Sequence, residues 1–94
     1  MWKSILFKVL SGEKNIPSPF HPRGTMRSLF VIVVEETREG FLWIWCSETH
    51  KGINISRMII PANVEAVHSD EIASLNVPNI EFEDPYQSMT DFNE

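Results

Sequence analysis

The chain has 94 residues, of which 43% are hydrophobic and 22% charged, with a single cysteine and a formal net charge of −5. This length fits one domain, and the apolar fraction is that of a globular protein. One cysteine excludes an internal disulfide and a multi-cysteine zinc site, and no apolar run reaches the ~18 residues of a membrane span. The start of the chain lacks the pattern of a signal peptide. We therefore expect a cytoplasmic protein without membrane contact.

Charge is unevenly distributed along the chain. Residues 1–34 carry five basic side chains and one acidic side chain, whereas residues 35–94 carry three basic and twelve acidic ones. After Arg57 there are eight acids and no Lys or Arg. Such an acidic stretch repels nucleic acid and membrane phosphates and attracts basic protein surfaces. It therefore argues against direct nucleic-acid binding.

The N-terminal segment combines two periodicities. Within residues 2–10, Ile5, Phe7 and Val9 alternate as in a strand, whereas Leu6, Val9 and Leu10 have helical spacing. We expect a strand. Residues 16–25 hold three prolines and one glycine, which predicts a long irregular loop.

Four further strands are predicted between residues 26 and 68. Leu29–Val34 is a continuous β-branched and aromatic run, as expected where both faces of a strand are covered. Residues 38–40 suit a tight hairpin leading into the aromatic strand 41–47, in which neither face is polar. Strands over 53–60 and 64–68 complete the set.

A short helix is expected near the C-terminus, followed by an acidic tail. Ser69 has the character of an N-cap, Asp70 and Glu71 fall in the first turn, and Pro78 limits the helix to one or two turns. Residues 1–77 would then form the domain, and residues 78–94 an extended or disordered tail.

These elements predict a mainly β (β-rich α+β) fold, namely a small antiparallel barrel or bent sheet of four or five strands. Residues 26–68, with an aromatic strand before a hairpin and a short closing strand, resemble Sm-like and SH3-like barrels in outline. No functional residue follows from that resemblance.

No pattern typical of an enzyme is present. The nucleophile-elbow, zinc-protease, phosphate-loop and dinucleotide motifs are all missing. The three histidines are too far apart in sequence to pair on a metal, and Cys46 lies in an apolar strand where a thiol usually packs as a small hydrophobe. We expect neither catalysis, nor a metal, nor a cofactor.

Two candidate binding regions remain. His21, Arg23 and Arg27 offer an imidazole and two guanidinium groups around Gly24, which is the composition of an anion-binding loop. The C-terminal stretch interleaves acids with aromatics, a pattern in which charge steers a partner and aromatic rings anchor it. Its expected partner-binding residues are Glu81, Phe82, Glu83, Asp84, Tyr86, Asp91 and Phe92.

The sequence thus predicts a non-catalytic protein-binding module. It would be an adaptor, or an inhibitor of the kind that phages and mobile elements encode, docking on a basic surface of a partner that can itself be a nucleic-acid-binding protein. The alternative is a small-ligand or nucleotide-binding β-barrel that uses the His21–Arg27 loop. A homo-oligomer assembled through Phe41–Trp45 is a third interpretation.

Overall fold

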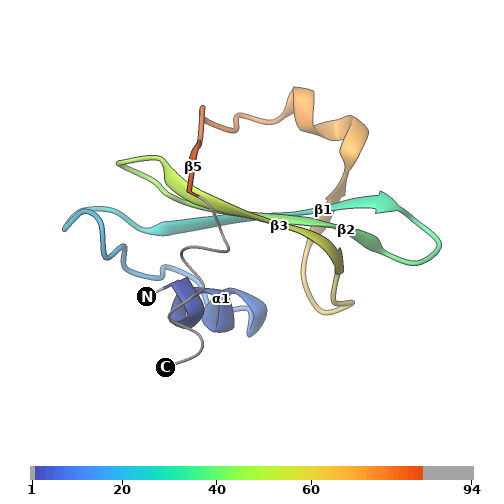
Figure 1. The fold of residues 1–94 in the computed structure, drawn as a ribbon, viewed down its shortest axis with the longest axis horizontal. Helices are drawn as coiled ribbons and strands as arrows, with labels where there is room; N and C mark the ends of the chain where they lie inside the picture. The colour runs from blue at the N-terminus through green and yellow to red at the C-terminus, as the bar shows by residue number, and fades with distance from the viewer. Residues whose placement is uncertain (1, 84–94) are drawn as a thin grey trace.

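The computed structural model describes residues 2–83 (Figure 1). One helix, α1 (Trp2–Leu10), precedes a sheet of five strands, and a 3-10 helix, η1 (Ser69–Ser74), lies between the last two strands. The strands are β1 (Met26–Val34), β2 (Glu39–Cys46), β3 (Lys51–Ile59), β4 (Ala66–His68) and β5 (Glu81–Phe82). The fold is therefore mainly β, as expected.

The sheet is open and mixed, so of the two predicted forms, an antiparallel barrel or a bent sheet, the barrel is wrong, and so is the purely antiparallel pairing. Its strand order is β4-β1-β2-β3-β5. The pairs β1–β2 and β2–β3 are antiparallel, whereas β4 runs parallel to β1 and β5 parallel to β3. The two edge strands are short, with three residues in β4 and two in β5. They lie at opposite edges of the sheet and do not pair with each other, so the sheet stays open.

The three long strands form a meander with tight turns. Arg38 and His50 adopt positive φ angles of 60° at the two connections, a conformation that reverses the chain in a few residues. Arg38 also fixes the far end of β3, because its Nε donates to the Ile60 carbonyl at 3.0 Å and its Nη2 to the Pro61 carbonyl at 2.9 Å. The hairpin is thus tied to the chain that leaves β3.

One face of the sheet, the helix face, packs against α1. Alternating residues of the three long strands point to this face, including Phe30, Leu42, Ile44 and Ile53. The helix contributes Trp2, Ile5 and Val9, all at most 5% exposed. These side chains form the main hydrophobic core, together with Ile16, Met26, Ile32, Cys46 and Ile60.

The expectation of a strand at residues 2–10 is wrong. The buried side chains Trp2, Ile5 and Val9 recur every three or four residues, which is the period of a helix face, while Phe7 is 60% exposed. A helix in this place covers the apolar side chains that β1 and β2 present on the helix face. The local sequence is compatible with both a strand and a helix. Packing against the apolar face of the sheet selects the helix.

The opposite face, the arm face, is crossed by residues 69–83, which we call the arm. Figure 1 shows α1 on one side of the sheet and the arm on the other. Under the arm lie Val31, which is fully buried, and Trp45, which is 8% exposed. The Ile80 side chain packs on Gly52 of β3. Both faces are therefore covered, which explains why neither face of β1 and β2 is polar.

The helix and extended tail expected near the C-terminus are not supported. Residues 69–74 form a 3-10 helix whose N-cap position is His68, and no side chain caps it. The chain then returns to the sheet as β5, which pairs Glu81 with Lys51 and Phe82 with Gly52. The expected tail thus joins the sheet at Glu81–Phe82, and its residues 84–94 lie outside the described part of the chain.

Candidate functional site

The arm is acidic and lies at the surface. It carries Asp70, Glu71, Glu81 and Glu83 and no Lys or Arg, and none of its residues is buried. Two of its apolar side chains are also open to solvent, Leu75 at 37% and Phe82 at 46% exposure. The arm therefore presents negative charge with apolar side chains between the acids.

Three aromatic rings form a row on the arm face, which we call the aromatic row: Phe41, Trp43 and Phe82. The ring centroids of Phe41 and Trp43 are 5.2 Å apart, and those of Trp43 and Phe82 are 5.6 Å apart, with tilted planes. Such tilted contacts are favourable between aromatic quadrupoles. Phe82, which the sequence places in a partner-binding tail, therefore contacts its own sheet.

Asn54 lies beside this row. It is the cross-strand partner of Trp43, so both side chains are on the arm face. Its Oδ1 is buried and has no hydrogen-bond partner within the described residues. A buried carbonyl oxygen without a donor is rare in folded proteins, so this acceptor marks a place where an N–H group would be stabilised.

The other expected partner-binding residues separate into two groups. Glu81 is exposed, and its backbone N–H donates to the His50 carbonyl at 2.9 Å. Glu83 accepts a hydrogen bond from Trp2 Nε1 at 3.0 Å, so its carboxylate faces the start of α1. The remaining four are not among the described residues: Asp84, Tyr86, Asp91 and Phe92.

The proposed anion loop is not gathered around one cavity. The Arg23 backbone N–H donates to His21 Nδ1 at 3.0 Å, and the Gly24 N–H donates to the His21 carbonyl at 3.0 Å. Arg27 instead belongs to β1, where it is opposite Trp45. It lines a groove to which neither His21 nor Arg23 contributes.

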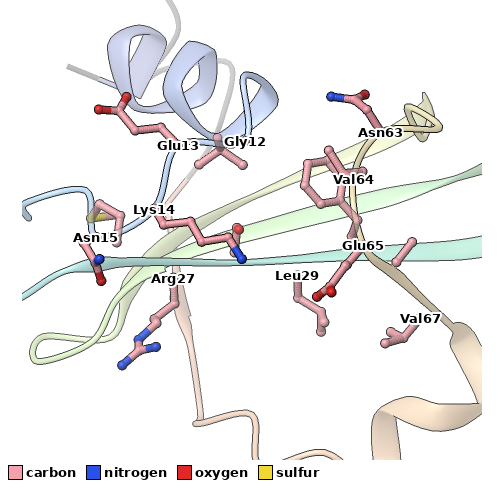
Figure 2. Close-up of a pocket in the computed structure, with 15 residues that line it drawn as sticks. Gly12, Glu13, Lys14, Asn15, Arg27, Leu29, Asn63, Val64, Glu65 and Val67 are labelled. Atoms are coloured by element: carbon pink, nitrogen blue, oxygen red, sulfur yellow. The ribbon is translucent and has the colours of Figure 1, made fainter.

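That groove, of about 710 Å³, lies at the outer edge of β1 (Figure 2). Loop residues 12–15 form one wall and residues 63–67 the other. Lys14 and Glu65 reach towards each other from these walls, whereas Arg27 projects below β1. Because Glu13 also lines the groove, its charges are mixed and do not single out an anion. No local pattern in the sequence predicts the groove, since its walls meet only in the fold.

Cys46 is fully buried on the helix face and is surrounded by polar donors. Burial raises the pKa of its thiol, but hydrogen bonds from Ser18, from Thr49 and from the backbone of Glu48 outweigh that effect and lower the pKa from 9.0 to about 7. Ser18 Oγ donates to the sulfur at 3.0 Å. Although the sequence identifies Cys46 as a core residue, it gives no sign of the donor from Ser18, which is 28 residues away in the chain.

Residues 2–83 contain neither a cluster of metal ligands nor a membrane-spanning helix. No group of three or more His, Cys, Asp or Glu side chains is placed to hold a metal ion. Neither described helix has the length and apolar character that crossing a membrane requires. Beyond the chain itself, no known protein family, curated protein or solved structure matches it.

Proposed function

We propose that this protein is a non-catalytic binding module whose acidic arm docks on a basic surface of a partner protein. The observation that carries the proposal is the composition of the arm, which has four acids, no Lys or Arg, and no buried residue. A surface of one charge sign attracts a partner of the other sign and speeds association. An adaptor or an inhibitor of a protein with a basic, nucleic-acid-binding surface would have this chemistry.

Exposed apolar side chains on the arm support the proposal. Leu75 and Phe82 are large, and solvent reaches more than a third of each. At protein interfaces a few apolar or aromatic anchors supply most of the affinity, while surrounding charges guide the approach. The arm combines both components on one segment.

The test compares two triple variants of the whole chain. Asp70→Asn, Glu71→Gln and Glu81→Gln neutralise exposed acids of the arm, and Glu35→Gln, Glu36→Gln and Glu48→Gln neutralise three exposed acids elsewhere. A partner is captured from the native host, identified by mass spectrometry and titrated against both variants. Only the arm variant should bind more slowly, and added salt should slow the unmodified protein in the same way. Equal association rates for the two variants would contradict the proposal.

A small-ligand or nucleotide-binding role is the second candidate. The observation behind it is the groove at β1, in which Arg27 and Lys14 supply two cations beside the carboxylates of Glu13 and Glu65. If phosphate-bearing ligands bind there, they should raise the melting temperature, and Arg27→Ala should abolish the rise while Arg23→Ala, outside the groove, should not. Loss of the rise in Arg23→Ala instead would favour the His21–Arg27 loop.

A further inference from the structure

We propose that Trp43, Phe41 and Asn54 form a binding site for an arginine side chain of the partner, which displaces the third ring of the aromatic row, Phe82. This inference rests on the proposed function, because it names the group that a basic partner would insert. The site lies on the arm face, where β5 of the arm meets β3.

The first argument is the unpartnered acceptor. Asn54 Oδ1 is buried and receives no hydrogen bond from the described residues, although it lies beside the ring of its cross-strand partner Trp43. An acceptor that no described residue satisfies gains a hydrogen bond when a ligand brings an N–H group. The ligand must therefore carry a donor.

The second argument is the ring system beside that acceptor. The face of an indole or phenyl ring carries negative potential and attracts cations, with tryptophan the strongest of the three aromatic side chains. Trp43 lies in the middle of the row, between Phe41 at 5.2 Å and Phe82 at 5.6 Å. A cation that is flat enough to stack is therefore favoured over Trp43.

Arginine meets both requirements at once. Its guanidinium is planar, stacks on aromatic faces and carries five N–H donors at its edge, so a group stacked on Trp43 can still donate sideways to Asn54. A lysine ammonium is a compact, strongly hydrated charge that cannot stack. The acids of the arm, among them the exposed Glu81, add attraction for either cation but do not distinguish them.

Phe82 occupies the place that the guanidinium would take. Its ring packs on Trp43 but remains 46% exposed, and β5 pairs only two residues of the nine-residue β3. Displacing the ring therefore disturbs a short strand at the edge of the sheet and leaves the core on the helix face intact. Once displaced, the ring becomes available to contact the partner.

The experiment uses the full chain and two synthetic peptides of equal charge, one with three Gly-Arg repeats and one with three Gly-Lys repeats, both capped. Binding is followed by NMR through the Trp43 indole N–H and the Asn54 amide signals. The arginine peptide should bind about five-fold more tightly than the lysine peptide and should shift both signals.

Three variants separate this site from general attraction to the arm. Asn54→Leu should reduce the preference for arginine to nearly none without loss of thermal stability, whereas Ser56→Ala, a change at an exposed position of the same strand, should leave the preference unchanged. Phe82→Ala should strengthen binding of the arginine peptide, because the competing ring is removed. A purely structural role of Phe82 would not produce that gain.

Other outcomes overturn the inference. Equal affinities for the two peptides, unaffected by Asn54→Leu, would mean that the arm attracts any cation, which leaves the proposed function in place and removes the arginine site. Absence of binding at millimolar concentrations of both peptides would remove the arginine site and also the electrostatic basis of the proposed function. Weaker binding by Phe82→Ala would refute the displacement of the ring.

Discussion

Trp2 Nε1 donates a hydrogen bond of 3.0 Å to Glu83 Oε2, across a sequence separation of 81 residues. Trp2 belongs to α1 on the helix face, whereas Glu83 follows β5 at the end of the arm. The bond therefore links the two layers that cover opposite faces of the sheet. Because Trp2 is only 2% exposed, its indole N–H depends on this acceptor.

Removing this acceptor should weaken the fold. Glu83→Ala leaves a buried indole N–H without its charged partner, so we expect a loss of about 1.5–3 kcal/mol in the free energy of unfolding. The neighbouring Glu81→Ala removes an exposed carboxylate and should cost less than about 0.5 kcal/mol. Urea denaturation of both variants checks the difference. Equal stabilities would show that the link contributes nothing.

Substitution of Gly40 should prevent the sheet from forming in its native register. A Cβ atom at this position would overlap the carbonyl oxygen of Val31 in the neighbouring strand. Gly12→Ala is the matched control, because no atom lies within 4 Å of the added Cβ and only the φ of +80° is unfavourable there. We expect Gly40→Ala to lose the native circular dichroism spectrum and Gly12→Ala to lose about 1–2 kcal/mol. A folded Gly40→Ala protein of native stability would refute this account of the β1–β2 contact.

The stability lost when an apolar side chain is truncated to alanine should depend on how deeply that side chain is buried. Ile44 is fully buried between α1 and the sheet, so Ile44→Ala should cost about 2–5 kcal/mol, a large fraction of the stability of so small a domain. Val33 is 55% exposed on β1, and Val33→Ala should change stability by less than about 0.5 kcal/mol. Chemical denaturation measures both values. A similar cost for the two would mean that the described core does not hold the fold.

Stability should rise with pH above neutrality because of Cys46. The folded protein lowers the pKa of this thiol from 9.0 to about 7, so it favours the thiolate. The resulting stabilisation is fully present above about pH 9 and is lost as the pH falls through about 7, and its size is roughly 1–3 kcal/mol.

The control for this prediction is Ser18→Ala, which removes the donor to the sulfur. It should raise the pKa and flatten the rise in stability between neutral and alkaline pH. Ultraviolet absorbance of the thiolate gives the pKa, and urea midpoints give the stability. A profile for Ser18→Ala that is as steep as that of the unmodified protein would contradict the role of this hydrogen bond.

The sequence predicts the meander well because its signals are local. The apolar run Leu29–Val34 and the aromatic strand that follows it are β-forming whatever surrounds them, and both occur as strands. The segment 2–10 has both strand-like and helix-like periodicity, and packing against the sheet selects the helix. A strand of two residues, such as β5, has no period to detect. Its existence depends on Glu81 and Glu83 donating backbone hydrogen bonds to His50 and Gly52.

The features of the candidate site likewise divide into those visible in the sequence and those that only the fold creates. The acidic character of residues 69–83 is a property of composition, so it is visible in the sequence. The aromatic row is not, because it joins Phe82 to Trp43 through a parallel pairing between distant segments. Asn54 becomes notable only when its burial and its missing donor are known.

The strand order also determines which parts of the molecule exchange their amide hydrogens first. The antiparallel strands β1, β2 and β3 are consecutive in the chain, so their pairing closes only short loops, whereas β5 must bring residues 81–82 back to β3 across a longer stretch. The arm has no buried residue, and short contacts such as the two-residue β5 pairing and the Trp2–Glu83 hydrogen bond hold it on the sheet. It is therefore the unit that opens at the lowest free energy, and each opening uncovers the tryptophans of β2 while the meander stays protected from solvent.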